Sequence, residues 1–421
     1  MNQPTVLKTS GRRWLRPFWR LAVVGLALGL AAYFLLPAWA APPTSTYDSL
    51  RLYTEALFEV SQKYVWPKNE EELIYGSLRG IMNALDPDSS FLTAKEYQIY
   101  LQGQPRPPAE AGLELIVKDS LLTAVSVIDG GPAARAGMKP GDHIIKLNGQ
   151  MVRNVTTQEA ARRFQGAPNS TLKVQVIRNG EIKPLDLTIT LEPLGPSTVT
   201  TAYLDKDVAY LRLRYFNEGT PGELDTALNN IKQHKPPVKG IILDLRNNAR
   251  GSMEEAVRSA SLFLGNQQIV LTKGRAPKTE QTFSGKDRDL VFKTLPPMVV
   301  LVDEGTARAA EIVASALRDQ ARATLLGAKT FGLCGLTKAF PLEDGSALVM
   351  TVAQCYAPKG AKIQGKGLEP EVPGQKPQAA KAPEKAPAQV QSPEQDPWVQ
   401  QAMELLTSGK PQPAAQEKPA T

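Results

Sequence analysis

The sequence predicts a multi-domain protein of the α/β class, specifically a layered α/β core preceded by a helical unit and interrupted by a β-rich module. In the second half of the chain, apolar β-branched segments such as residues 239–245 and 298–302 alternate with amphipathic helical segments. Short β-type runs separated by turns fill the region that begins at Gly112. A length of 421 residues accommodates two or three domains.

The N-terminal segment has the pattern of a membrane anchor. Five basic residues and no acidic residue lie in residues 1–20, and removing their charge from the net +7 leaves only +2 for the rest of the chain. That remainder predicts no basic surface for nucleic acid. Residues 21–41 carry no charge and approach the roughly 20 residues that span a bilayer.

Basic residues before an apolar run place the N-terminus in the cytoplasm and send the following chain across the membrane. We therefore expect residues 1–20 to be cytoplasmic and residues 21–41 to be a single-pass anchor in the inner membrane. Cleavage near Ala38-Trp39-Ala40, which resembles a signal-peptidase site, would instead give a secreted protein. Both alternatives place the main body outside the cytoplasm, in the periplasm.

Residues 44–105 are expected to form a helical unit. Apolar residues from Leu50 to Tyr64 recur every three or four positions, which is typical of one face of an amphipathic helix. Trp66-Pro67 ends this helix, and Asp86-Pro87 stops a second helix over Glu70–Ala84.

Residues 106–195 are expected to form the β-rich module. The predicted strands are 113–117, 123–128, 143–147, 172–178 and 185–191, and the predicted helix is 156–164. The run GPAARAGMKPGDHIIKLNG makes this module resemble a PDZ domain of the circularly permuted bacterial type. The resemblance implies a groove for peptide C-termini formed by Gly112, Leu113, Glu114, Leu115, Ala161 and Phe164. Alternatively, Leu113 and Leu115 belong only to the core of the module.

Residues 196–372 are expected to form the α/β core. The predicted strands are 207–213, 239–245, 298–302 and 323–326, the predicted helices are 220–233, 253–264 and 309–320, and residues 347–353 close the sheet. Residues 373–421 are rich in Pro, Ala and Gln and are expected to be a disordered tail containing one possible short helix, 396–406.

Two cysteines flank a predicted hairpin. If Asp344 and Gly345 form a two-residue turn, Cys334 and Cys355 lie directly opposite each other in a non-hydrogen-bonded pair. Because the predicted compartment is oxidising, we expect a disulfide, with two buried free thiols as the alternative. No metal-ligand spacing or cofactor fingerprint is found, so no metal or cofactor is expected.

Several motifs in order resemble the carboxyl-terminal processing, or tail-specific, serine peptidases. The motifs are LDPDSSFL, ILDLRNNARG, AAEIVASALRDQARATLLGAKTFG and DGSALVMTVAQCYAPKGAKIQGKGLEPEV. The resemblance implies a peptidase-like α/β sandwich and cleavage near substrate C-termini. It also implies a serine nucleophile, an activating lysine and a positioning glutamine.

The catalytic positions implied by the resemblance are changed in this chain. The serine position holds Arg308, the lysine position Leu333 and the glutamine position Thr337, and the glycine pair of the oxyanion hole is Arg250-Gly251. A serine needs a base, and an arginine remains charged and cannot act as one at neutral pH. The sequence thus predicts an inactive member of a serine-peptidase family.

Residues that would have to replace the lost groups lack a suitable partner in the sequence. We considered Thr306, Lys338, Lys329, Ser252, Cys334, His143 and His234. A further hypothesis is that Arg308 and Arg250 bind a peptide carboxylate; the alternative is that both are exposed loop arginines.

The predicted function is a membrane-tethered pseudopeptidase that binds protein C-termini or regulates an active homologous protease. The alternatives are an active endopeptidase with a rearranged nucleophile and a structural envelope protein whose PDZ module has no ligand.

Overall fold

The computed structural model describes residues 46–102, 107–118, 121–152, 155–195, 197–276, 279–292, 294, 296–375 and 392–408. Contacts divide the chain into two units, Met1–Leu73 and Ile74–Thr421. The described part of the first unit holds α2 (Thr46–Lys63) and the start of α3 (Glu70–Asn83). These two helices have nearly the predicted bounds.

No helix among the described residues is both long and apolar enough to cross a membrane. The predicted basic segment, residues 1–20, and the predicted anchor, residues 21–41, lie outside the described residues.

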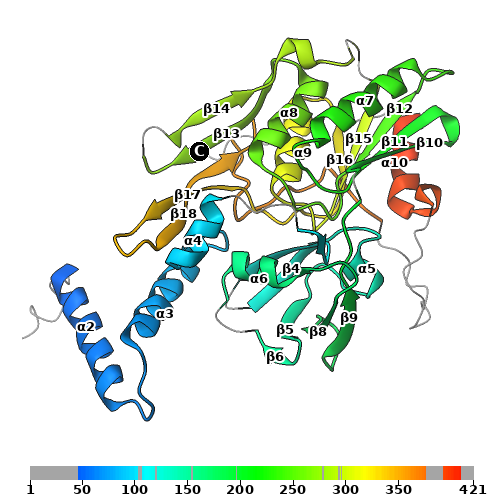
Figure 1. Ribbon diagram of the computed structural model, residues 1–421. Coiled ribbons are helices and arrows are strands. Elements are labelled where there is room, and N and C mark those ends of the chain that lie inside the picture. The colour runs from blue at the N-terminus through cyan, green and yellow to red at the C-terminus, as the bar shows by residue number, and fades with distance from the viewer. Residues whose placement is uncertain are drawn as a thin grey trace, which may run out of the picture. The chain divides into compact units, whose positions relative to one another are not determined.

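A six-stranded sheet forms the centre of the second unit (Figure 1). Its strand order is β10 (Val199–Leu204), β11 (Val208–Leu213), β12 (Gly240–Asp244), β15 (Met298–Val302), β16 (Thr324–Gly327) and β19 (Val372–Pro373). Only β10 pairs antiparallel; the other neighbours are parallel. Parallel strands are covered on both faces, which explains the continuous apolar runs of β12 and β15. The sequence did not predict β10.

Helices cover both faces of this sheet. The helices α7 (Thr220–Gln233), α8 (Met253–Leu264) and α9 (Ala309–Asp319) share one apolar cluster with one face. The other face packs against α10 (Pro397–Thr407), through Val399 and Ala402. Arg246 also binds Asp396, the N-cap of α10, at 2.8 Å. The possible short helix predicted over 396–406 within the 373–421 tail is therefore confirmed as α10. It packs on the core because a short amphipathic helix suffices to cover an exposed sheet face.

A second sheet of five strands lies beside α8 and α9. It comprises β1 (Ser90–Leu92), β13 (Gln268–Gly274), β14 (Gln281–Ser284), β17 (Gly335–Pro341) and β18 (Ala347–Tyr356). The prediction that residues 347–353 close the central sheet is wrong, since β18 pairs with β17, β13 and β1. Neither β13 nor β14 was predicted from the sequence; both mix apolar with polar residues and are separated by a polar turn.

The β17–β18 hairpin differs from the predicted two-residue turn. Leu342 donates to the carbonyl of Ser346 at 2.8 Å, so the loop has three residues and ends at Gly345, whose φ is +83°. This glycine takes the left-handed conformation that three-residue hairpins require. Pairing is consequently one residue out of the predicted register near the turn.

A register shift between Leu336 and Thr337 restores the predicted alignment at the open end of the hairpin. Cys334 and Cys355 are disulfide-bonded, with a Cα–Cα distance of 5.4 Å, which confirms the predicted disulfide. The pair is hydrogen-bonded, rather than non-hydrogen-bonded as predicted, because Cys355 donates its amide to the carbonyl of Cys334 at 2.9 Å. The predicted loop was one residue too short, and no bulge was predicted. These two differences offset each other, so the two cysteines remain opposite.

The inserted β-rich module has its own core. Its sheet runs β3 (Leu113–Lys118), β4 (Leu121–Val127), β5 (His143–Leu147), β8 (Thr171–Ile177) and β9 (Leu185–Thr190), with β6 (Gln150–Met151) on β5. Smaller elements of the module are β2 (Ala109–Glu110), α5 (Pro132–Arg135), α6 (Thr157–Arg163) and β7 (Gln165–Gly166). The helix α4 (Ala94–Leu101) precedes the module and contacts β1. In this sheet β3 is an edge strand, and it contacts α6. The module therefore has the edge-and-helix layout expected of a peptide groove.

The disulfide should stabilise the hairpin measurably. Replacing both cysteines by alanine releases a cross-link between residues 21 apart, which corresponds to about 3 kcal/mol of chain entropy in the unfolded state. Urea denaturation of the C334A/C355A variant should show that loss, and reduced wild type should unfold at the same urea concentration as the variant. Equal stability of oxidised wild type and variant would contradict the expectation.

Candidate active site and peptide groove

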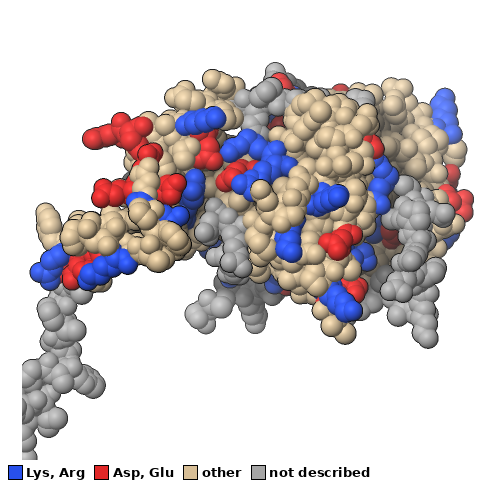
Figure 2. All heavy atoms as spheres, turned by 60° about the horizontal axis from the view of Figure 1, so that its bottom comes forward, with Lys and Arg blue, Asp and Glu red and all other residues tan. Residues whose placement is uncertain are grey.

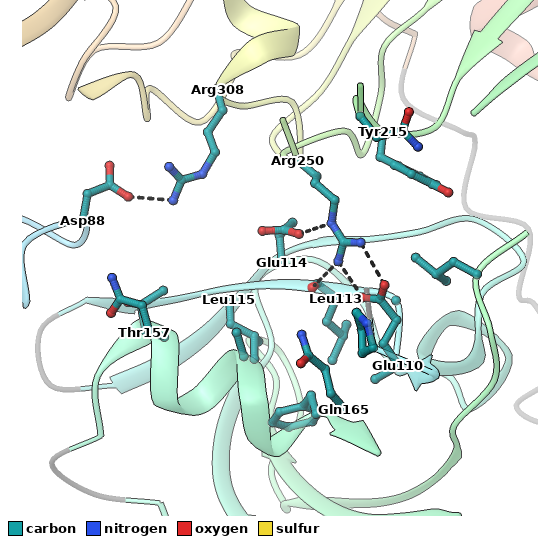
Figure 3. A pocket seen from close by; sticks show the side chains of 18 of the residues that line it. Asp88, Glu110, Leu113, Glu114, Leu115, Thr157, Gln165, Tyr215, Arg250 and Arg308 are labelled. Atoms are coloured by element: carbon teal, nitrogen blue, oxygen red, sulfur yellow. Dashed lines mark hydrogen bonds and ion pairs between the residues drawn. The ribbon is translucent and has the colours of Figure 1, made fainter. Parts of the chain in front are cut away.

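One pocket of about 740 Å³ joins the predicted peptide groove to the predicted catalytic positions (Figure 3). All six predicted groove residues line it: Gly112, Leu113, Glu114, Leu115, Ala161 and Phe164. Arg308, Thr337 and Arg250 line the same pocket, whereas Leu333 is not among its lining residues. The fold thus brings together side chains that lie far apart in the sequence.

The groove side of the pocket is formed by β3 and α6. Thr157, at the start of α6, accepts a hydrogen bond from the amide of Val117 at 3.2 Å, which fixes the helix beside the edge strand. Leu113 and Leu115 are 8% and 5% exposed and belong to the core cluster of the module. They also line the pocket. The groove and core interpretations of these two leucines are therefore compatible.

Arg308 occupies a strained turn between β15 and α9. Its φ of 53° and ψ of −119° lie where a non-glycine residue is unfavourable by about 1–3 kcal/mol. Hydrolases use a strained strand-to-helix turn of this kind to present a nucleophile. Here the amide of Arg308 donates to the carbonyl of Leu333 at 2.9 Å. The guanidinium donates to Oδ1 of Asp88 at 2.6 Å. The turn thus has the strained conformation but presents the guanidinium of Arg308, paired with Asp88, in place of a nucleophile.

Leu333 is buried in a small apolar cluster that connects two modules. The leucine is 2% exposed and packs with Ala249 and Ala307 of the core and with Ile116 and Val125 of the inserted module. A leucine in this cluster cannot accept a proton. Its role is to bury apolar surface between the two modules.

Thr337 is exposed on β17, where Thr351 of β18 is its cross-strand partner. Its side chain lines the pocket. The three predicted degenerate positions therefore have different surroundings. Arg308 is paired, Leu333 is buried and Thr337 faces the pocket.

Arg250 connects the core to the segment around Gly112–Leu115, the predicted carboxylate loop, which by resemblance would receive the C-terminal carboxylate of a peptide (Figure 3). Its Nε binds Glu114, and its two terminal nitrogens bind Glu110 at 3.1 and 2.8 Å. The guanidinium also lies 5.6 Å from the ring centre of Tyr215. Burial lowers the pKa of Arg250, but the carboxylates of Glu114 and Glu110 outweigh this effect and raise it. The interpretation of Arg250 and Arg308 as exposed loop arginines is wrong, because each is held by carboxylates.

Gly251 follows Arg250 and has a φ of +124°. A Cβ at this position would lie 2.3 Å from Cβ of Phe216. The remaining glycine of the predicted oxyanion pair is therefore required by packing.

Asn247, in the same loop, holds the other end of the module. Its side chain accepts from the amide of Val127 at 2.9 Å and donates to the carbonyl of the same residue. Its own amide donates to Asp303 at 2.7 Å. No role for Asn247, Asp88 or Glu110 was predicted from the sequence. Asn247 and Asp88 lie within motifs that carried the family resemblance, so their positions were a usable signal.

Glu311 fixes the loop that carries Leu333. This carboxylate is fully buried near the N-terminus of α9 and accepts from the amides of Gly332 and Leu333 at 2.7 and 2.9 Å and from the hydroxyl of Thr330. Burial raises the pKa of Glu311 to about 7, although these hydrogen bonds act in the opposite direction. Its position supports the fold of the site rather than proton transfer at the pocket.

The residues considered as replacements have structural roles. Thr306 is buried and donates to the carbonyl of Leu245 at 2.9 Å. Ser252 caps α8 in a capping box. Lys329 pairs with Glu369 at 2.6 Å.

The remaining candidates also have partners of their own. Lys338 is exposed beside the ring of Phe340. Cys334 is in the disulfide. His143 contacts Thr123 at 2.9 Å, and His234 stacks on Tyr203. The structure brings none of these candidates together as a nucleophile and base within the described residues. Those residues also contain no group of three or more side chains suited to hold a metal ion.

Comparison with known proteins assigns the two modules. The model of peptidase family S41 matches residues 207–373, and the model of the PDZ domain matches residues 110–189. A carboxy-terminal-processing protease of Bartonella bacilliformis is 33% identical over 330 residues, which cover 78% of this chain and 75% of that protein. The chain belongs to the carboxy-terminal processing proteases of family S41.

Further relatives agree with this family. The carboxy-terminal processing protease CtpA of Bacillus subtilis is 31% identical over 80% of this chain and 71% of its own length. The solved structure of a photosystem II D1 C-terminal processing protease is 25% identical and superposes with a TM-score of 0.63, covering 77% of this chain and 92% of that one. The predicted family and the α/β fold class with a PDZ domain are confirmed.

Because Arg308 has a positive φ, we expect glycine at this position to give a more stable protein than alanine, the reverse of the order at most positions. Arg308→Gly and Arg308→Ala both remove the pair with Asp88, but only glycine relieves the positive φ. The glycine variant should therefore be more stable than the alanine variant by about 1 kcal/mol in urea denaturation. The same two substitutions at exposed Lys329, which is not among the positive-φ residues, should show alanine equal or better. An alanine variant at least as stable as the glycine variant at position 308 would contradict this account.

The raised pKa of Glu311 predicts a stability that falls as pH rises. The unfolded carboxyl loses its proton near pH 4.5, whereas the folded one keeps it to about pH 7. The folded state binds the extra proton between these values, so stability declines by about 3 kcal/mol across this range. The difference between wild type and Glu311→Gln in urea denaturation should change with this slope. A constant difference from pH 4 to pH 8 would contradict the assignment.

Proposed function

We propose that this chain is a pseudopeptidase that captures protein C-termini in its PDZ groove. The burial of Leu333 in an apolar cluster carries the proposal, because this is the position where a lysine base would be required. Serine activation by lysine needs a titratable amine beside the nucleophile. Here a leucine and the paired guanidinium of Arg308 occupy these two positions.

The groove supports peptide capture by strand addition. The edge strand β3 presents backbone groups beside α6, and side chains from both elements line the open pocket. An extended peptide would hydrogen-bond to the edge, and its side chains would enter pockets between strand and helix.

The setting that we propose is the outer side of the inner membrane. This part rests on the basic residues 1–20 and the uncharged residues 21–41. A tethered chain that binds C-termini without cleaving them would act as an adaptor or as a regulator of an active homologous protease.

Binding without turnover is the expected result for the purified full chain in detergent. Calorimetry should detect a peptide of about ten residues with a free C-terminal carboxylate and an apolar last residue. The amidated peptide should bind at least about ten-fold more weakly, because the carboxylate loop recognises the terminal charge. A fluorogenic version of the same peptide should not be cleaved. Turnover sensitive to a serine-directed phosphonate would overturn the proposal in favour of a rearranged nucleophile.

Groove variants locate the binding site. Leu113→Asp should abolish binding, but this residue also belongs to the module core. Ala161→Gln is the more specific variant, because Ala161 is half-buried on α6 and lines the pocket. Arg163→Gln, exposed on the same helix, is the matched control. Unchanged affinity in Ala161→Gln would place binding elsewhere and leave the structural-protein alternative.

A further inference from the structure

The charged side chains of the groove do not balance. Three carboxylates line the pocket, from Asp88, Glu110 and Glu114, against only two arginines, Arg250 and Arg308. On the face in Figure 2, the basic and acidic side chains of the described residues are interspersed. The lining of the groove carries an excess of one negative charge.

Both arginines are already committed to protein carboxylates. Arg250 donates through all three of its nitrogens to Glu114 and Glu110, and one of these nitrogens also lies 3.4 Å from the carbonyl of Leu113. Arg308 is bound to Asp88. A ligand anion would have to displace one of these partners at its own desolvation cost. The geometry therefore opposes the earlier hypothesis that the two arginines receive a peptide carboxylate.

Two carboxylates have acceptor capacity left in the groove. Oδ2 of Asp88 is buried without a hydrogen-bond partner, and the side chain of Asp88 is only 5% exposed. Glu114 uses Oε1 for Arg250, and its side chain is 24% exposed on the edge strand where a peptide would pair. An unpaired buried carboxylate oxygen is unfavourable unless a donor reaches it. A cationic side chain from the ligand would supply that donor.

We propose that the groove selects peptides that carry a lysine or arginine a few residues before the C-terminus, with Glu114 and Asp88 as the residues that determine this specificity. The inference rests on the proposed capture of C-termini and adds the chemical class of the captured peptide. The last residue of the peptide would enter between Leu113, Leu115 and Phe164. The basic side chain, further from the terminus, would face the carboxylates.

Peptides that differ in one charge test the inference on the full chain. Three peptides of about ten residues would share a free carboxylate and an apolar last residue, and would carry Lys, Ala or Glu at each of the third to fifth positions from the end in turn. At the position that faces Glu114, the lysine peptide should bind about five-fold tighter than the alanine peptide, and the glutamate peptide more weakly than both. The preference should shrink when salt is raised from about 0.05 to 0.5 M.

Variants assign the preference to named carboxylates. Glu114→Gln keeps an acceptor for Arg250 but should reduce the ratio of lysine-peptide to alanine-peptide affinity to below about two-fold. Asp88→Asn should reduce it as well. Because each ratio is measured within one variant, a partly unfolded sample does not change it. Glu181→Gln makes the same charge change on an exposed turn of the module and should leave the ratio unchanged.

Arg250→Ala most directly distinguishes a groove that selects cationic peptide side chains from one that selects anionic ones. Removing this cation frees Glu110 and Glu114, so the preference for lysine should increase. If the arginines instead bound ligand anions, wild type would prefer the glutamate peptide and Arg250→Ala would lose that preference; this outcome would overturn the inference. Equal affinity for the three peptides would overturn it too, while leaving the capture of C-termini intact. Failure to bind any of them would refute both proposals.

Discussion

The buried carboxylate of Glu311 holds the site together. It accepts hydrogen bonds from the amides of Gly332 and Leu333 and from the hydroxyl of Thr330, and so fixes one loop against the start of α9. That loop positions Leu333 in the apolar cluster shared with the PDZ domain. The carbonyl of Leu333 also accepts a hydrogen bond from the amide of Arg308. Because two of these hydrogen bonds come from backbone amides, they do not depend on which side chains stand at positions 332 and 333.

The side chains at the predicted catalytic positions make contacts between modules. Leu333 packs against Ile116 and Val125 of the PDZ domain, and Arg250 binds its two glutamates. Arg308 binds Asp88, in the segment that leads into β1. A guanidinium with several donors suits such bridges, since it can bind carboxylates from different segments at once. The predicted catalytic positions therefore contribute contacts that hold neighbouring segments and the PDZ domain against the core.

Much of the architecture was predictable from local patterns. The strands His143–Leu147 and Met298–Val302 and the helix Met253–Leu264 were predicted with their observed bounds. These elements have strong apolar periodicity and clear capping or turn residues. The strands β10, β13 and β14 were not predicted because each mixes apolar with polar residues and lacks the continuous apolar run of β12 and β15. Their pairing partners, which determine their conformation, are distant in sequence.

The hairpin illustrates the limit of counting residues. Opposite positions for Cys334 and Cys355 were predicted correctly, but the loop has three residues and a bulge compensates for the extra one. Turn length and bulges depend on the local backbone conformation, as the positive φ of Gly345 shows. Two structures with the same net register are indistinguishable from spacing alone.

The sequence by itself determined the family and the α/β class, and it predicted the loss of the catalytic residue types, because these depend on which residues follow one another. Only the tertiary structure decided the charge of the groove. Asp88, Glu110 and Arg250 are separated by 22 to 162 positions, and their pairing follows from the packing of the PDZ domain against the core. Two arginines that suggested an anion site are neutralised by three carboxylates, so the same residues now predict a preference for basic peptides. Coulomb interactions depend on distances in space, which the order of the residues does not contain.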